Sequence, residues 1–283
     1  MNLSTTGLSL IANAAIDLQL HTTYSDGGWT DDQLLDYLIA EGFSLAAITD
    51  HDRADTARGL QKLAADKQFP LLVAVEMSAM WKGELTDLLC YGFDPDDNRL
   101  DALAQDVTYR QHENTRQIFN YLISKGYAFD LQELERMLAK PAAQQLPELL
   151  ALAQKHIQDR KAIGRTLLDG GFAYMTHDPA TIVEAAHQSG AVCILAHPGR
   201  RDGFVCYDHA LLDELRCEAP VDGIEAYYPL HTPEQTAMYR EYAQRQGLLI
   251  SAGSDSHSLD KPPIKYRAEL CRAFLERLGI QME

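Results

Sequence analysis

Short apolar segments alternate with amphipathic segments along the first third of the chain. Ala15–Leu20 and Phe43–Thr49 are predicted as buried strands, and Leu71–Val75 and Leu85–Phe93 as two more strands. Between the first two strands, Thr30 opens a sequence with the form of a capping box, which predicts the start of a helix. Strands that alternate with helices are typical of a parallel sheet with crossover helices.

The alternation stops near Asp94, and the segment that follows is polar and helical. Asp101–Lys125 is predicted as one long helix. Shorter helices are predicted at Leu131–Ala139, Pro147–Gln158 and Lys161–Asp169. We therefore expect residues 96–180 to form a helical insertion in a domain built from residues 1–95 and 181–283.

Strands and helices alternate again in the last third of the chain. The predicted strands are Ala191–Ala196, Gly223–Tyr228 and Leu248–Ala252. The predicted helices are Pro179–Ser189, a helix from Thr232 to Gly247, and Ala268–Leu278. Residues 1–14, which precede the first strand, are expected to form a loosely ordered arm. The pattern as a whole predicts an α/β fold.

Side chains that bind metal ions recur at the ends of the predicted strands. They are His21 and Asp26, His51, Glu76, His197, and the pair Asp255 and His257, with Asp87 at the start of the fourth strand. In α/β barrels the strand ends converge on one face, so these side chains should meet there. Imidazole and carboxylate ligands together suit Zn, Mn or Fe. Two or more such ions can hold a phosphate and activate water for hydrolysis.

Charge and cysteine content limit the partners. The chain has 25 Lys and Arg against 41 Asp and Glu, a formal charge of −16. Such a surface repels polyanions, so we expect no stable binding to duplex nucleic acid, whereas a small phosphorylated substrate is compatible with it. Five cysteines without a CxxC pair favour a reduced, cytoplasmic protein. We expect no signal peptide and no membrane span, and the oligomeric state stays open.

Seven motifs occur in an order that resembles the PHP (polymerase and histidinol phosphatase) family. They are DLQLHTTYSDG, AITDHD, VAVEMS, LLCYGFD, ILAHPGR, DGIEAYYPLHTPEQ and SAGSDSH. Together they run from Asp17 to His257 and are far more specific than any single motif. The chain is similar to stand-alone PHP phosphoesterases, such as nucleoside 3′,5′-bisphosphate phosphatases and short-RNA 5′ exonucleases. The resemblance implies a distorted (β/α)7 barrel with a trinuclear metal centre and a helical insertion covering the active site.

The resemblance also implies how the strand-end side chains share the ions. The three groups are His21, Glu76 and Asp255; then Glu76, His197 and Asp87; then Asp26, His51 and His257. A hydroxide that bridges two ions would attack the phosphorus. We expect two or three divalent ions, of manganese, iron or zinc.

Three positions depart from the family pattern. The family opens with His-x-His, and Gln19 stands in place of the first His. Gln19 is either a ligand or a hydrogen-bond partner that orients one, and we favour the partner. Asp87 also replaces a His; it is either a ligand or an acceptor behind one, and as a ligand it would favour harder ions such as Mn, Fe(II) or Mg. In the insertion, Ala162 replaces a third His.

Two arginines and one histidine are candidates for contact with the substrate. Arg200 follows His197 closely, and a guanidinium matches the geometry of a phosphate. Arg160 matches an Arg of the family pattern in the insertion and is the second candidate for phosphate binding. His231 is a candidate proton donor, so Arg200 and His231 are the predicted catalytic residues. Arg160 and Arg200 could also be ordinary surface charges.

We therefore expect a hydrolase that acts on phosphoric ester bonds. The preferred reading is a metal-dependent phosphomonoesterase for a small nucleotide-like substrate. The residues leave two alternatives open: an exonuclease on short oligonucleotides, and a non-catalytic metal-binding PHP module. The charge of −16 counts against long nucleic acids, while the three departures from the family pattern keep the non-catalytic alternative open.

Overall fold

The computed structural model describes residues 3–283, which form two compact units. The first unit combines Met1–Leu103 with His177–Glu283, and the second unit is Ala104–Thr176. The division falls inside a long helix, α3 (Leu100–Ser124), rather than before it. The second unit is helical, and the first combines strands and helices.

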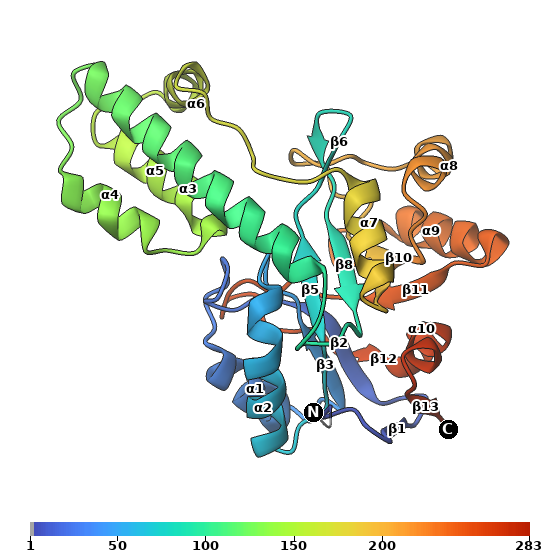
Figure 1. Cartoon of the computed structure of the whole chain (residues 1–283). Helices are drawn as coiled ribbons and strands as arrows, with labels where there is room; N and C mark the ends of the chain where they lie inside the picture. Colours follow the sequence, from blue (N-terminus) through green and yellow to red (C-terminus); the bar gives the residue numbers. More distant parts are fainter. Residues whose placement is uncertain (1–2) are drawn as a thin grey trace. The chain divides into compact units, whose positions relative to one another are not determined.

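The first unit is built on two sheets (Figure 1). One sheet has the strand order β11-β10-β9-β8-β5, and the other has the order β12-β2-β3-β4. Their bounds are β2 Ala15–Leu20, β3 Leu45–Ile48, β4 Leu71–Leu72, β5 Ala74–Met77, β8 Leu88–Tyr91, β9 Val192–Leu195, β10 Gly223–Tyr227, β11 Leu249–Ala252 and β12 Tyr266–Arg267. The predicted α/β fold is therefore confirmed, while the pairing gives two sheets and no single closed ring among the described residues.

Strand β8 runs against both of its neighbours, which corrects the expectation of a parallel sheet. It pairs antiparallel with β5 and with β9, whereas β9, β10 and β11 are parallel to one another. Leu88, the first residue of β8, is opposite Met77 and Leu195, the last residues of the neighbouring strands. Asp87 therefore lies at the same end of the sheet as the residues that follow β5 and β9.

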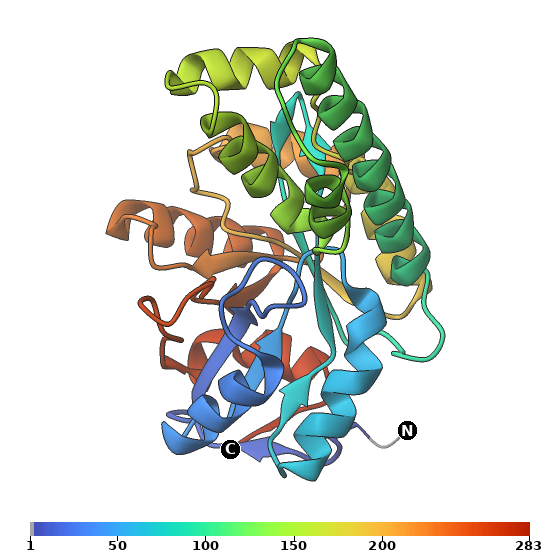
Figure 2. The ribbon, with the colours of Figure 1, turned by 90° about the vertical axis from the view of Figure 1, so that its left-hand side faces the viewer.

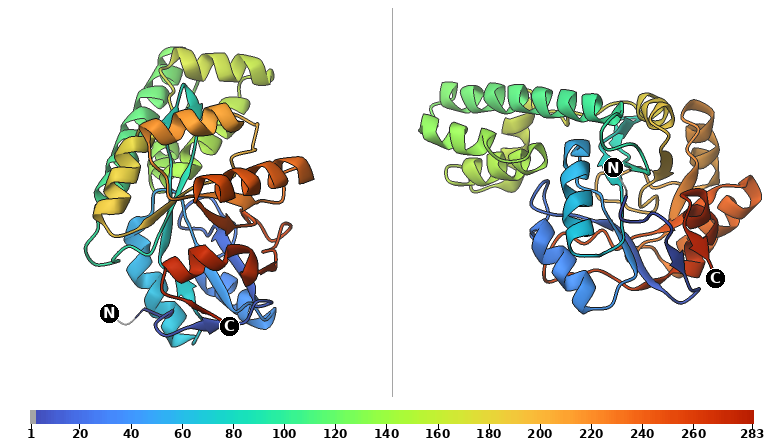
Figure 3. Two further views of the ribbon diagram at one scale, coloured as in Figure 1. Left: turned by 90° about the vertical axis from the view of Figure 1, so that its right-hand side faces the viewer. Right: turned by 60° about the horizontal axis from the view of Figure 1, so that its bottom comes forward.

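Helices cover the outer sides of these sheets. They are α1 Asp31–Ala40, α2 Ala57–Asp66, α7 Pro179–Gln188, α8 His209–Glu218, α9 Pro233–Gln246 and α10 Arg272–Arg277. Leu34 and Leu38 of α1 and Leu60 of α2 are fully or almost fully buried in one apolar cluster with Leu71 of β4. Helix α9 packs against β10 and β11 (Figure 3). Short 3₁₀ helices stand at Ala54–Thr56 and Ala268–Cys271, so the predicted C-terminal helix begins as a 3₁₀ turn.

A second apolar cluster contains buried side chains from strands of both sheets. Tyr91 is fully buried there, packs edge-on against Phe274, and donates its hydroxyl to the carbonyl of Leu18 at 2.7 Å. The two ends of the chain meet beneath it, where β1 (Ser9–Leu10) pairs in parallel with β13 (Gln281–Met282) (Figure 1). The expectation that residues 1–14 form a loosely ordered arm is thus wrong for the part nearest β2, because Leu10 is buried. Residues 1–2 lie outside the described part of the chain.

The second unit consists of the rest of α3 with α4 (Leu131–Leu138), α5 (Ala142–Gln154) and α6 (Arg160–Asp169) (Figure 2). Pro147 was expected to begin a helix but lies inside α5. Burial of Leu149 and Leu152 in the core of this unit outweighs the backbone hydrogen bond that the proline removes. The remaining strands, β6 (Met80–Trp81) and β7 (Glu84–Leu85), form a small hairpin. Across residues 3–283, no helix has both the length and the apolar composition required to cross a membrane.

Gly223 tests the packing of the five-stranded sheet. A Cβ at this position would lie 2.4 Å from Ile194 Cδ1 and 2.6 Å from the carbonyl oxygen of Leu249. We expect Gly223→Ala to lower the free energy of unfolding by about 1–3 kcal/mol, as overpacking does, measured by urea unfolding. Gly59→Ala in α2 is the control, since its Cβ meets nothing within 4 Å and should stabilise by up to about 1 kcal/mol. Equal stability of Gly223→Ala and the unaltered chain would contradict the packing described here.

Candidate metal centre

Glu76, the third residue of β5, is the centre of the candidate site. Its side chain is fully buried, and its Oε2 lies 3.0 Å from Nε2 of His21. Its Oε1 lies 3.1 Å from Nε2 of His197, and Nε2 of His51 is 3.9 Å from Oε2. Residues that follow β2, β3 and β9 therefore converge on one carboxylate, as the strand-end pattern predicts.

A second group of contacts adjoins the first. Oδ1 of Asp255 lies 3.2 Å from His21 Nε2 and 3.4 Å from His257 Nδ1. His257 Nε2 is 3.3 Å from Oδ1 of Asp26, and the rings of His21 and His257 are stacked with centroids 3.9 Å apart. The loop after β2 and the loop after β11 are thus joined through one pair of imidazoles.

The structure places these donors in three groups. Within each group, the possible ligand atoms all lie within 4.8 Å of one another. The groups are His21, Asp26, His51 and His257; His21, Glu76 and Asp255; and His51, Glu76 and Asp87. The second group has the same members as one ion site implied by the resemblance. The other two differ from the implied sites by one histidine each, and His197 lies beside the third group, 4.0 Å from Asp87 Oδ2.

The donor set fits bound cations on two counts. Both ring nitrogens of His21, Nδ1 of His51 and Oδ1 of Asp255 are buried and make no hydrogen bond of suitable geometry, although His21 Nε2 lies 3.0 Å from Glu76 Oε2 and 3.2 Å from Asp255 Oδ1. Burial alone would lower the pKa of His21, but Asp255 and Glu76 outweigh it and raise that pKa well above its usual range. Burial likewise works against ionised Glu76, yet the surrounding imidazoles, His51 first, hold its pKa well below the usual range. Positive charge is therefore required between these side chains, and protons or metal ions can supply it.

Gln19 lies next to this centre as a hydrogen-bond partner. Its amide nitrogen donates to both oxygens of Glu76, at 3.1 and 3.0 Å. Gln19 is therefore a hydrogen-bond partner of a candidate ligand, and whether it orients that ligand around an ion stays a prediction. Asp87 is buried among other acids, and burial followed by the charge of Glu76 raises its pKa well above the usual range. A carboxylate that binds protons this readily would also gain from a nearby cation.

Acidic side chains behind the centre hold its loops. Asp50 accepts hydrogen bonds from the backbone of Thr22 at 2.7 Å and from the hydroxyl of Ser25 at 2.6 Å, in the loop that carries Asp26. Asp17 accepts from the amide of Ser254 at 2.9 Å, and burial raises its pKa to about 7. Both act as hydrogen-bond acceptors behind the candidate ligands.

The loop after β9 is also held from behind. Glu225 accepts from the amide of His197 at 2.9 Å. His197 and Asp255 have φ values of +26° and +55°, a region that non-glycine residues rarely adopt. Backbone strain of this kind at two predicted ligands is typical of functional sites.

Arg200 lies at the side of the centre. Its Nη1 is 3.5 Å from Oδ2 of Asp255, and its guanidinium carbon is 4.2 Å from the centroid of the Phe204 ring. The hydroxyl of Tyr228 donates to the same Asp255 oxygen at 3.4 Å. Arg200 thus lies beside the candidate ligands.

His231 and Arg160 are placed differently from Arg200. Nδ1 of His231 lies 3.2 Å from the carbonyl of Ala226, and its Nε2 accepts from the amide of Gly199 at 3.0 Å. Burial lowers the pKa of His231 to about 4, so the ring is neutral and both nitrogens hold backbone. This geometry favours support of the His197–Arg200 turn over proton donation. Arg160 is exposed at the start of α6 in the other unit, and its role stays a prediction.

Sequence reasoning missed Phe204, Tyr228 and Gln235. Tyr228 directly follows β10, so its position at a strand end is a signal in the sequence, but a tyrosine is not a usual metal ligand. Phe204 lies in a loop with no periodic signal. Gln235 donates to the carbonyl of Gly199 at 3.1 Å from the first turn of α9, which only the folded chain reveals.

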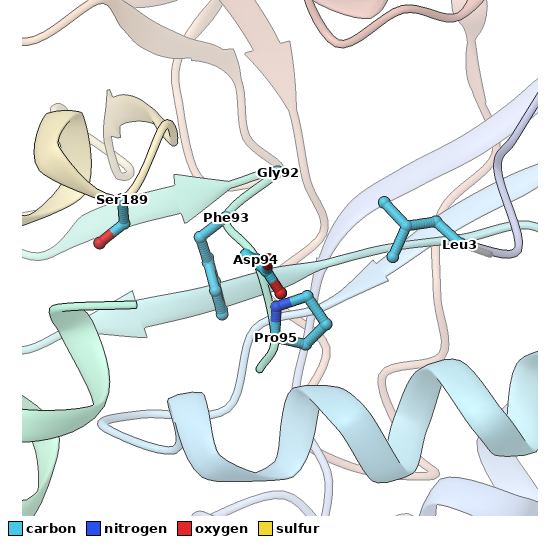
Figure 4. A pocket seen from close by; sticks show the side chains of 6 residues that line it. All are labelled: Leu3, Gly92, Phe93, Asp94, Pro95 and Ser189. Carbon is cyan, nitrogen blue, oxygen red and sulfur yellow. The ribbon is translucent and has the colours of Figure 1, made fainter. Parts of the chain in front are cut away.

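A separate cavity of about 350 Å³ lies beyond the C-terminal end of β8 (Figure 4). It is lined by Leu3, Gly92, Phe93, Asp94, Pro95 and Ser189. Because β8 is antiparallel, this end of the strand is opposite the end that carries Asp87. Its lining includes no residue of the three ligand groups, so it is not the candidate centre.

Comparison with known proteins agrees with this geometry. No family model matches the chain. The 3′,5′-nucleoside bisphosphate phosphatase of Chromobacterium violaceum is 28% identical over 87% of this chain and 88% of its own length. The phosphoribosyl 1,2-cyclic phosphate 1,2-diphosphodiesterase of Eggerthella lenta is 29% identical over 85% and 93%, respectively. A 5′-3′ exoribonuclease of Haemophilus influenzae is 26% identical over 85% and 89%.

Two solved structures share the fold. An amidohydrolase from Chromobacterium violaceum has a TM-score of 0.75 and 24% identity, covering 94% of this chain and 96% of its own. A protein from Bifidobacterium adolescentis named as a metal-dependent phosphoesterase has a TM-score of 0.74 and 20% identity, covering 93% and 96%. The predicted similarity to nucleoside bisphosphate phosphatases and 5′ exonucleases is confirmed by these relatives. The relatives, a phosphatase, a phosphodiesterase and an exoribonuclease, also confirm the predicted class, a hydrolase acting on phosphoric ester bonds.

Removal of Glu76 tests how the ligands are shared. Glu76 belongs to two of the three ligand groups, so we expect Glu76→Ala to bind fewer metal ions per chain than the unaltered protein, measured by elemental analysis. Phosphoesterase activity should fall by more than about a hundredfold, the upper end for residues that only support a ligand. Glu214→Ala, at an exposed carboxylate outside the groups, is the control. Unchanged metal content in Glu76→Ala would contradict the shared role of this carboxylate.

The pKa shifts predict how metal binding responds to pH. The raised pKa values of His21 and Asp87 mean that both side chains keep their protons to higher pH than usual in the metal-free protein. An incoming ion must displace these protons, so affinity should rise as pH rises from about 6 to about 8, with protons released on binding. Chelator competition at several pH values measures the affinity, and calorimetry in buffers of different ionisation enthalpy measures the protons. An affinity that stays constant over this range would contradict the assignment.

Proposed function

We propose that the chain is a metal-dependent phosphomonoesterase for a small nucleotide-like substrate. The observation that carries this proposal is the convergence of eight strand-end donors around Glu76. They are His21, Asp26, His51, Glu76, Asp87, His197, Asp255 and His257. A set of this size and mixed chemistry suits two or three divalent ions of manganese, iron or zinc, with Asp87 favouring the harder ones.

Bound ions would activate water and neutralise the phosphoryl oxygens. The protein's own contribution is to hold the ligands and the substrate. Gln19 fixes the carboxylate of Glu76 through two hydrogen bonds, and Glu225 fixes the backbone of His197. Arg200 offers a guanidinium to the phosphoryl group at the edge of the ligands. Each of these contacts exists before substrate binds, which limits the reorganisation that the reaction requires.

The finer architecture that we propose is the distorted (β/α)7 barrel. Two isolated bridges join the edge strands of the five-stranded sheet, β11 and β5, to the inner strands β2 and β3 of the other sheet: Leu20 pairs with Ser256, and His51 pairs with Glu76. Both bridges involve residues of the candidate centre or their neighbours. Partial closure of the sheets at this end would bring the loops after β2, β3, β5 and β11 together.

We assign substrate choice to the helical unit Ala104–Thr176, with Arg160 as its proposed phosphate contact. The relative with phosphatase activity on nucleoside bisphosphates supports a small nucleotide-like substrate. The exoribonuclease relative keeps short oligonucleotides as the second candidate, and the charge of −16 counts against longer ones. Five free cysteines support the cytoplasmic location that we propose.

A substrate screen tests the proposal. We expect the manganese-loaded protein to release phosphate from nucleoside bisphosphates faster than it shortens oligonucleotides. Asp255→Ala should reduce this turnover by more than about a hundredfold, because it removes a donor from the centre, whereas Asp66→Ala at the exposed end of α2 should not. Activity on oligonucleotides alone would favour the exonuclease. A metal-loaded protein without turnover on any phosphoric ester would support the non-catalytic alternative.

A further inference from the structure

The carboxylate of Asp255 divides its two oxygens between different partners. Oδ1 faces the predicted ligands, 3.2 Å from His21 Nε2 and 3.4 Å from His257 Nδ1. Oδ2 instead faces two donors from other loops, Nη1 of Arg200 at 3.5 Å and the hydroxyl of Tyr228 at 3.4 Å. Two donors from separate parts of the chain therefore point at one place beside the candidate metal centre.

Both donor contacts are long compared with charge-assisted hydrogen bonds, which are about 2.7–2.9 Å. Loose hydrogen bonds in a free enzyme commonly tighten when substrate binds. A phosphoryl group at the centre would bring several acceptor oxygens to this place. Arg200 and Tyr228 could then bind those oxygens without leaving their present positions.

Phe204 supports this arrangement from the side. The guanidinium of Arg200 lies over its ring at 4.2 Å, a distance typical of a cation–π contact. The same ring meets the imidazole of His197 edge-on at 5.1 Å, and the ring of Tyr228 lies 5.5 Å from that imidazole. One ligand histidine is therefore flanked by two aromatic rings, one of which also carries the arginine.

We propose that Tyr228 is a second phosphoryl-binding donor beside Arg200, and that Phe204 positions Arg200 for the same task. The inference rests on the proposed phosphomonoesterase function and assigns two further residues to it. Tyr228 would touch the substrate and is a catalytic residue in that sense. Phe204 acts through Arg200 and is a positioning residue. The ligand class is a phosphate monoester or its product, inorganic phosphate.

Binding of inorganic phosphate to the manganese-loaded protein tests the donor. We expect Tyr228→Phe, which removes only the hydroxyl, to weaken phosphate binding about tenfold by calorimetry, with unchanged metal content. Tyr242→Phe is the matched control, because it removes a hydroxyl that donates to Asp213, and neither residue belongs to the three ligand groups. Phosphate affinity in Tyr228→Phe equal to that of the unaltered protein would overturn the role of Tyr228.

A pair of substitutions tests Phe204. Phe204→Leu removes the ring and should weaken phosphate binding about three- to tenfold, while Phe204→Tyr keeps the ring and should restore it. In turnover assays, Phe204→Leu should raise KM with kcat nearly unchanged, since the ring acts on phosphate binding through Arg200. The positioning role would be overturned if Phe204→Leu bound phosphate as tightly as the unaltered protein. It would also be overturned if Phe204→Leu and Phe204→Tyr lost the same amount of phosphate affinity.

The binding and turnover measurements separate the two proposals. If the unaltered protein binds phosphate in a Tyr228-dependent manner but hydrolyses no ester, the proposed function fails and the phosphate site stands. If the metal-loaded protein hydrolyses esters but Tyr228→Phe and Phe204→Leu behave like the unaltered protein, the function stands and the inference fails. A metal-loaded protein that binds no phosphate overturns the inference.

Discussion

A buried carboxylate that requires positive charge is the constraint on which the rest of the structure depends. Glu76 is fully buried, and an isolated charge in such a place is strongly unfavourable. His21 and His197 lie within 3.1 Å of its two oxygens, and Gln19 donates to both. These groups come from β2, β5 and the end of β9, so balancing one charge fixes three strands at one face of the molecule. Ions bound there would balance the charge and at the same time supply the chemistry of phosphoric ester hydrolysis.

The sequence predicted this convergence because its signal is local. A ligand side chain directly after an apolar segment indicates a strand end, and strand ends of an α/β fold meet on one face. The direction of β8 could not be predicted in this way. Leu88–Tyr91 is apolar at every position, so its pattern is the same for either direction. Only its pairing shows that Asp87, before the strand, lies level with residues that follow the neighbouring strands.

The residues that the sequence did not reveal depend on contacts between distant segments. Phe204 gains its importance from Arg200 and His197, and nothing in its own loop marks it. His231 was a reasonable proton donor by residue type, but both of its nitrogens hold backbone groups in the folded chain. Pro147 shows the same limit within one helix, where buried leucines outweigh a local signal. Residue type predicts which groups can do chemistry, and packing decides which of them are free to do it.

The central claim is that Glu76 is shared between bound ions. Anomalous X-ray scattering from crystals of the manganese-loaded protein, measured on both sides of the manganese edge, tests it most directly. The account predicts at least two anomalous peaks, each within bonding distance of a carboxylate oxygen of Glu76 and of a nearby histidine. Manganese peaks that lie elsewhere, with the Glu76 carboxylate contacting only protein side chains, would contradict it.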